Sequence, residues 1–142
     1  QVSHRLLSPF FGLQLYLRVD PYHARVARAG LRFGRIRCNS QLHQMRLGQS
    51  DLCSFPLCAA NGVVDSADHI LMWCPRFRVS RNLAVAKLLR AGLPMSKAIL
   101  CGSFPADWSE DRCLSALACP VRLLSEIGRV YCGHFSLDLL DR

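Results

Sequence analysis

Apolar residues recur along most of this chain every three or four positions, which is the spacing of one face of an α-helix. Residues 76–91 predict a helix in this way, and its expected buried face comprises Val79, Leu83, Ala86 and Leu89. Ser109 is the predicted cap of a further helix, which Pro120 interrupts. The stripe of that helix comprises Leu117, Val121, Leu124, Ile127 and Tyr131. The pattern therefore predicts a mostly α fold.

The first third of the chain predicts two shorter helices. Residues 23–33 place three arginines on one helical face and Val26, Ala29 and Phe33 on another. Asn39 is expected to cap a second helix at residues 40–47, whose buried side comprises Leu42, Met45 and Leu47. Residues 6–19 predict a short strand or a packing arm, because a proline and a glycine interrupt them.

The centre of the chain predicts a loop followed by a helix with a defined end. Residues 50–66 are rich in Ser, Pro, Asn, Gly and Asp, a composition typical of loops. Ser66 is the expected cap of a helix from residue 67 to about residue 73. Pro75 predicts that this helix ends near Cys74, because the residue before a proline is disfavoured in the α region. Residues 97–102 are apolar, and their pattern does not distinguish a helix from a strand.

Length and composition indicate one folded domain, or one domain with an arm. The chain has 142 residues, of which 51% are hydrophobic, and this apolar content excludes intrinsic disorder. Its longest apolar stretch is broken by polar residues and is shorter than the roughly 20 residues of a membrane span. No secretory signal is visible, and the chain begins with Gln rather than Met. We therefore expect an intracellular protein, nuclear or cytoplasmic, that derives from a longer one.

Positive charge is concentrated in residues 1–50, which contain eight arginines and one acidic residue, while the whole chain carries a net charge of +8. Sixteen of the 18 cationic residues are arginine, which suits bidentate phosphate contact but also follows from GC-rich coding. The asymmetry predicts an anionic partner, most commonly RNA or DNA. The candidate contacts are Arg25, Arg28, Arg32, Arg35, Arg37 and Arg46. Phe33 and Trp73 are candidates for stacking on bases, although aromatic residues are more often buried in the core.

Cys53, Cys58, His69 and Cys74 form the sharpest chemical pattern, Cys-x4-Cys-x10-His-x4-Cys. Three thiolates and one imidazole complete the tetrahedral coordination of Zn²⁺ without a further ligand. On a continuous α-helix, five residues rotate a side chain by roughly 140°, so His69 and Cys74 would diverge. A helix that ends before Pro75 removes this conflict, because Cys74 can then fold back. The sequence therefore predicts a small helical domain organised around a zinc-binding loop.

The eight cysteines leave other arrangements open. A secreted scaffold would pair them in disulfides, but the missing signal and the ample apolar content favour reduced thiols. Those expected to be reduced core or free thiols are Cys38, Cys101, Cys113, Cys119 and Cys132. A second metal site of looser spacing would comprise Cys113, Cys119, Cys132 and His134. A catalytic zinc is disfavoured, because four protein ligands leave no position open for water.

Residues 25–81 resemble the zinc-binding module near the C-terminus of reverse transcriptases from non-LTR retrotransposons. Four stretches match the family in order. Residues 31–43 contain a run of the Leu-Arg-x-Gly-Arg type followed by Asn-x-x-Leu, and residues 47–53 match the segment that leads to the first cysteine. Residues 65–71 match a motif in which an acidic residue, a hydroxyl residue, any residue and a second acidic residue precede the histidine, and residues 74–77 match the Cys-Pro-x-aromatic ending. Arg81 and the Leu-x-Gly-Ser segment at 100–103 match as well. The first two intervals between ligands are longer than is usual in the family.

The resemblance implies a C-terminal fragment of a polyprotein whose polymerase domain lies upstream and is a partner. The chain lacks the aromatic-x-Asp-Asp motif of polymerases and the acidic-x-Lys step of restriction-like endonucleases, so we expect no enzyme activity in it. We expect an N-terminal arm at 1–22, basic helices with the zinc module at 23–92, and a C-terminal helical segment at 93–142. The leading hypothesis is a zinc-stabilised nucleic-acid-binding module that helps hold element RNA or target DNA. The alternative is a zinc-structured protein-interaction module without direct nucleic-acid contact.

Overall fold

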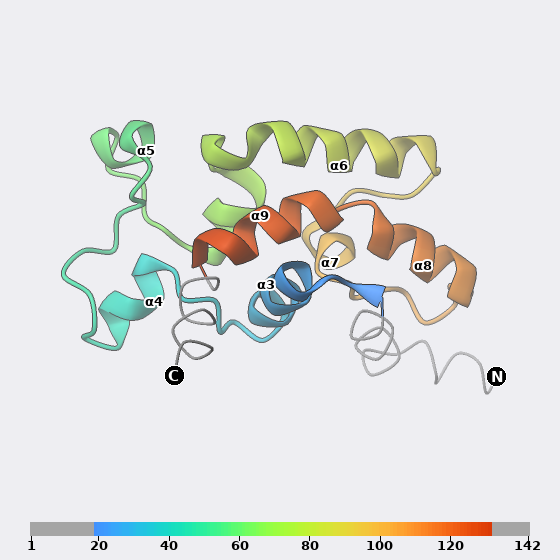
Figure 1. Ribbon diagram of the computed structural model, residues 1–142, viewed down its shortest axis with the longest axis horizontal. Helices are drawn as coiled ribbons and strands as arrows, with labels where there is room; N and C mark the ends of the chain where they lie inside the picture. The colour runs from blue at the N-terminus through green and yellow to red at the C-terminus, as the bar shows by residue number, and fades with distance from the viewer. Residues whose placement is uncertain (1–18, 132–142) are drawn as a thin grey trace.

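Helices form the framework of the described part of the chain, residues 19–131 of a computed structural model (Figure 1). They are α3 Tyr22–Arg32, α4 Asn39–Gln44, α5 Pro56–Ala60, the π-helical turn η1 His69–Trp73, the 3₁₀ turn η2 Pro75–Phe77, α6 Arg78–Arg90, α7 Lys97–Leu100, α8 Glu110–Ala118 and α9 Val121–Tyr131. Within these residues the only β pairing is an isolated antiparallel bridge between Leu52 and Val64. The predicted mostly α fold is confirmed. The predicted strand or arm at 6–19 lies outside the described residues, apart from its last position.

α3 and α9 form the centre of the fold and pack directly against each other (Figure 1). α3 contributes small buried side chains such as Ala24, which let the two helices approach closely. On α9, Gly128 faces the backbone of α3, and a Cβ at this position would overlap the carbonyl of His23. Leu124 and Ile127 of α9 are fully buried, as their stripe predicts. The two halves of the described chain therefore share one hydrophobic core.

α6 buries the face opposite to the predicted one. Val79 and Leu89 are 71% and 69% exposed and Ala86 is exposed as well, so the predicted buried stripe is wrong. The face that is buried comprises Ser80, Arg81, Ala84 and Leu88. The Ser80 hydroxyl donates to a glutamate of α9, and the Arg81 guanidinium donates to two backbone carbonyls. Because these polar groups find partners inside the fold, they can be buried, and apolar spacing alone does not reveal this.

α4 is more exposed than its pattern predicts. It buries no residue, and Met45 and Leu47 are exposed while Leu42 is half-buried, so the predicted buried side is wrong. The predicted cap is also corrected, because the helix already begins at Asn39. The backbone N–H of Asn39 donates to Oδ2 of Asp65 at 2.8 Å. A carboxylate from a distant loop therefore caps this helix in place of the asparagine side chain.

Local signals set the other helix ends as predicted. The Ser66 hydroxyl accepts a hydrogen bond from the N–H of His69 at 3.1 Å, and the Ser109 hydroxyl accepts one from the first turn of α8. Cys74 has an extended backbone, with ψ of 124°, immediately before Pro75. The predicted central loop contains one additional short helix, α5, and the apolar segment that received no assignment contains α7.

Candidate metal centre

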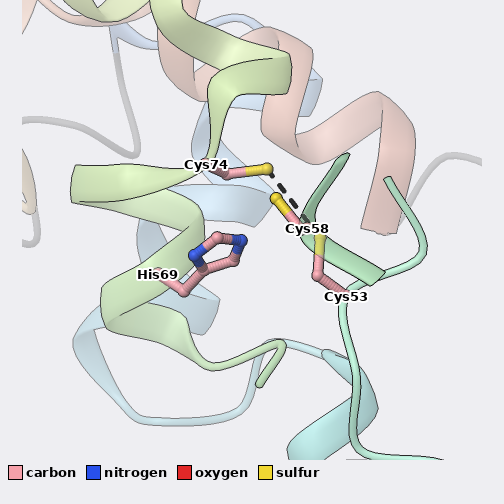
Figure 2. Close-up of side chains that lie close together, drawn as sticks. All are labelled: Cys53, Cys58, His69 and Cys74. Atoms are coloured by element: carbon pink, nitrogen blue, oxygen red, sulfur yellow. Dashed lines mark hydrogen bonds between the residues drawn. The ribbon is translucent and has the colours of Figure 1, made fainter. Parts of the chain in front are cut away.

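Four buried side chains converge on one small volume in the centre of the predicted zinc-binding loop. The ligand atoms of Cys53, Cys58, His69 and Cys74 all lie within 4.8 Å of one another. Figure 2 shows the three sulfurs and the imidazole facing one another. The Sγ atoms of Cys53 and Cys74 are 3.9 Å apart, close to the separation of about 3.8 Å expected for two ligands of a tetrahedral metal with bonds of about 2.3 Å. The four predicted ligands are thus brought together and can hold a metal ion.

His69 is one of two described histidines with a buried ring nitrogen that lacks a partner, and the other, His23 on α3, lies outside the tetrad. The Nε2 atom of His69 is buried and has no hydrogen-bond partner in the described part of the chain, a situation that costs about 1–3 kcal/mol in a folded protein. Burial lowers the pKa of His69, against the opposing effect of the Asp65 carboxylate. The imidazole is therefore neutral near pH 7, and a neutral imidazole with a free ring nitrogen is the form that binds a metal.

A closed loop presents the first two sulfurs. The N–H of Cys53 donates to the carbonyl of Val63 at 2.9 Å, and the N–H of Val63 donates to the carbonyl of Cys58 at 3.0 Å. Pro56 begins α5 inside this loop, where its missing N–H has no cost. Gly62 has a φ of +68°, which allows the chain to turn back toward Val63. The backbone thereby turns both sulfurs to the same side.

A π-helical turn brings the other two ligands together. The N–H of Cys74 donates to the carbonyl of His69 at 2.7 Å, a bond between residues five apart. Such a bond places the two residues one above the other, whereas an ordinary α-helix would separate their side chains around its axis. The end of the helix at Cys74 was predictable from Pro75. The widened turn carries no sequence signal, and it is what resolves the spacing conflict.

Burial and mutual proximity disfavour ionisation of the thiols. Burial raises the pKa of Cys53 to about 12, with the N–H of Phe55 opposing this and Cys74 adding to it. Burial and Cys74 also raise the pKa of Cys58, and the positive charge of Arg76 opposes them. A cation that binds here must replace the thiol protons. The charge of Arg76 would then offset part of the negative charge of three thiolates.

Two arginines contact the segments that carry the ligands, one at the turn and one at the loop. The Arg81 guanidinium is buried and donates to the carbonyls of Leu71 at 2.8 Å and Ile70 at 3.0 Å. It therefore satisfies carbonyls in the turn that carries His69. The Arg76 guanidinium lies over the ring of Phe55, 5.5 Å from its centroid, next to the loop that carries the first two sulfurs. In the sequence, Arg81 was notable only because it matches the family motif. The hydrogen bonds that show its supporting role are visible only in the structure.

Asp65 connects the metal centre to the rest of the fold. Its carboxylate is almost fully buried and accepts bonds from the Asn39 N–H and from the hydroxyl of Tyr131, both at 2.8 Å. Its backbone N–H donates to the carbonyl of Asp51, which closes the loop of the first two sulfurs. The loop, α4 and the end of α9 therefore meet at one carboxylate. Sequence reasoning missed this role, because the three partners are far apart in the chain.

Two of the predicted phosphate-contacting arginines face the interior. Arg28 is fully buried, and its guanidinium pairs with Asp20 at 2.7 Å and donates to the carbonyls of Leu100 and Leu117. Its assignment to a nucleic-acid-binding face is therefore wrong. Arg32 is half-buried and donates to the carbonyl of Gly102 at 2.6 Å. Helical spacing predicted that these arginines share one face, and the contacts of Arg28 and Arg32 direct their part of that face toward α7, α8 and the residues that follow α7.

Three of the remaining four predicted arginines lie on the surface. Arg25 on α3 is half-buried, and Arg35, Arg37 and Arg46 are exposed. Burial alternates along residues 35–38, since Ile36 and Cys38 point into the core. This alternation brings the side chains of Arg35 and Arg37 to the same outer side.

Both aromatic candidates for stacking are on the surface. Phe33 is 58% exposed and Trp73 is 72% exposed, so the expectation that aromatics of this kind lie in the core is wrong for these two. Phe33 follows the last residue of α3, and Trp73 precedes a ligand of the metal centre. Phe33 lines the same groove as Arg35 and Arg37, and an exposed ring beside arginines can stack on a base.

The cysteines outside the tetrad behave as reduced core thiols. All seven cysteines of the described range are free and buried. Burial raises the pKa of the thiols of Cys101, Cys113 and Cys119. The looser second metal site would need Cys132 and His134, which lie outside the described residues. Within that range the tetrad is the group whose ligand atoms converge.

Comparison of the chain with protein-family models, with curated proteins and with solved structures finds no match. Among the described helices, none combines the length and the apolar character needed to cross a membrane.

Proposed function

We propose that this chain is a zinc-stabilised nucleic-acid-binding module from the C-terminal part of a non-LTR retrotransposon reverse transcriptase. The observation that carries the proposal is the buried convergence of three sulfurs and one unpartnered imidazole nitrogen. Three thiols and one imidazole at tetrahedral separations favour Zn²⁺ over harder cations, which prefer oxygen ligands. The ordered resemblance of residues 25–81 to the family supports the origin.

The zinc site would position the basic segment through direct hydrogen bonds. The side-chain amide of Asn39 donates to the carbonyl of Leu52, next to the first cysteine, at 2.6 Å. The N–H of Ser40 donates to the carbonyl of Asp65 at 3.1 Å. These bonds fix the end of the segment that carries Arg35 and Arg37 against the loop of the metal centre. Folding of the loop around zinc therefore orders the cations that would contact phosphates.

The role of zinc in this proposal is structural. Four protein ligands saturate a tetrahedral ion, so no position is open for a reacting water. The module would hold element RNA or target DNA for the polymerase domain of the same polyprotein. Its exposed arginines would contact phosphates, which provides affinity and orientation without base specificity.

Metal analysis and binding measurements test the proposal together. We expect about one zinc ion per chain in the wild type and none in Cys53→Ser or His69→Ala. Binding of RNA or DNA should weaken steeply as salt increases, and Arg35→Ala combined with Arg37→Ala should reduce the steepness. Arg90→Ala, an exposed arginine on α6, is the matched control. An affinity that stays flat between low and high salt would contradict the phosphate contacts.

A protein-interaction module is the second candidate, and one observation favours it. α6 leaves Val79 and Leu89 exposed to solvent beside the exposed cations Arg78, Lys87 and Arg90. The helix contains no acidic residue, so an acidic amphipathic partner would complement this face. A zinc-dependent interaction that survives nuclease treatment and is lost in Val79→Asp would favour this candidate over nucleic-acid binding.

A further inference from the structure

A groove of about 500 Å³ lies between the end of α3 and α4, outside the metal centre. The residues that matter for its chemistry are Phe33, Arg35, Arg37, Gln41 and Met45. The volume falls in the range of about 300–1,000 Å³ that is common for small-ligand sites. None of the described residues that line the groove is acidic.

One wall of this groove is the tight turn that ends α3. The N–H of Arg35 donates to the carbonyl of Gly30 at 2.7 Å, and Gly34 between them has a φ of +64°. This is the 6→1 bond of a Schellman motif, which reverses the chain after the helix. Ile36 then packs onto Gly30, where a Cβ would lie 3.3 Å from the Cα of Ile36. The close packing of the returning chain leaves the ring of Phe33 on the outside.

The groove combines three kinds of group that match a nucleotide. Phe33 offers an aromatic ring that is 58% exposed. Met45, which follows α4 and also lines the groove, is 55% exposed. Arg35 and Arg37 supply positive charge at the same groove. The amide of Gln41 can both donate and accept hydrogen bonds, as the edge of a base requires. A nucleotide offers both a flat ring and a negative phosphate to this groove, whereas an aliphatic peptide offers only apolar surface.

We propose that this groove takes one unpaired base of a single-stranded nucleic acid, stacked on Phe33 with the adjacent phosphates at Arg35 and Arg37. This inference rests on the proposed nucleic-acid-binding function and specifies its substrate class. Bases inside a duplex have both faces covered by their neighbours, so a ring in a groove can stack only on a base that has left the stack. Stacking tolerates any base, so RNA and DNA strands are both ligands of this chemistry.

Fluorescence anisotropy with single strands of about 12 nucleotides, in RNA and DNA forms, and with the corresponding duplexes tests the inference. The wild type should bind the single strands about tenfold more tightly than the duplexes. Phe33→Ala and Phe33→Leu should weaken single-strand binding by about tenfold and leave duplex binding unchanged. Phe33→Trp should retain the affinity, because it keeps an aromatic face. Leu89→Ala, an exposed apolar residue on α6, should leave both affinities unchanged.

The outcomes separate this inference from the proposed function. Salt-dependent binding that is equal in the wild type and in Phe33→Ala overturns the base site and leaves the nucleic-acid-binding function intact. Equal affinity for single strands and duplexes also overturns the base site alone. Binding of none of the four probes by the zinc-loaded wild type overturns both. Unchanged zinc content and circular dichroism of Phe33→Ala show that a loss is local, as expected for a side chain that is mostly exposed.

Discussion

The α3–α9 core and the metal loop at residues 51–77 bury polar groups in opposite ways. In the core, the fully buried guanidinium of Arg28 has Asp20 as its counter-ion and two backbone carbonyls as acceptors. In the metal loop, Nε2 of His69 has no hydrogen-bond partner in the described residues, and the cysteine sulfurs face one another. The ion pair of Arg28 is thus complete within the core, although Nδ1 of His23 on α3 has no hydrogen-bond partner in the described residues. A bound cation would supply the partner that Nε2 of His69 and the three sulfurs can coordinate.

This difference indicates which region of the fold should depend on a bound metal ion for its stability. A buried polar group that already has partners contributes to a fold that forms by itself. A cluster of thiols whose ionisation burial disfavours gains its stabilising interactions only when a cation replaces the protons. The α3–α9 core should therefore persist without metal, while the metal loop and the α4 helix attached to it should not. Four experiments examine this contrast, in order of decreasing effect.

Removal of the proposed zinc ion should have the largest effect, because the binding of structural zinc is worth on the order of 10 kcal/mol. We expect a chelator to abolish the amide protection of Cys53, Val63 and Cys74 and to leave that of Leu124 largely intact. Hydrogen exchange measured by mass spectrometry resolves the two regions. Cys113→Ala, a buried cysteine of α8 outside the tetrad, should retain zinc. Protection that is lost in both regions together would show that the contrast does not exist.

Asp20→Ala should destabilise the core by about 3–5 kcal/mol, because it leaves the buried charge of Arg28 without its counter-ion. Both side chains of this pair are fully buried. Asp68→Ala is the matched control, since Asp68 pairs with Lys97 where both side chains are more than half exposed, and it should cost about 0–1 kcal/mol. Urea unfolding of the zinc-loaded variants measures both. Equal costs would mean that burial of the first pair has no energetic consequence.

Leu88→Ala and Leu89→Ala test the corrected face of α6. Leu88 is fully buried and Leu89 is 69% exposed, although the two are adjacent. Truncation of Leu88 should cost about 2–5 kcal/mol, and truncation of Leu89 less than about 0.5 kcal/mol. Thermal unfolding distinguishes them. A larger loss of stability in Leu89→Ala would mean that α6 buries the face predicted from the apolar spacing.

These corrections show what the sequence could and could not predict. The helix caps at Ser66 and Ser109 and the helix end before Pro75 depend on neighbours within a few residues, so local signals predict them. The four ligands were predictable because their side-chain chemistry and spacing are specific. The buried positions of Arg28 and Arg81 depend on partners elsewhere in the fold, and no pattern within one helix identifies such partners.

Tyr131→Phe tests the bond that joins the two regions, and we expect its cost to be the smallest of the four. The hydroxyl of Tyr131, at the end of α9, donates to Oδ1 of Asp65 in the metal loop at 2.8 Å. A hydrogen bond to a charged acceptor contributes about 1.5–3 kcal/mol, and the Asn39 N–H remains as a second donor, so we expect the lower end. Urea unfolding of the zinc-loaded protein measures it.

The same bond has a pH dependence whose sign is set by Tyr131. Burial raises the pKa of Tyr131 above its ordinary value of 10.0, and the charge of Asp65 adds to this effect. The folded protein therefore keeps the phenol proton at pH values where the unfolded chain has lost it. The stabilisation is complete below about pH 10 and decreases as the pH rises further, because the unfolded state then binds fewer protons. The difference in stability between the wild type and Tyr131→Phe should accordingly be constant at neutral pH and shrink above pH 10. A difference that grows with alkaline pH would mean that the phenol is ionised in the folded state, and the α3–α9 core would then not be joined to the metal loop through this proton.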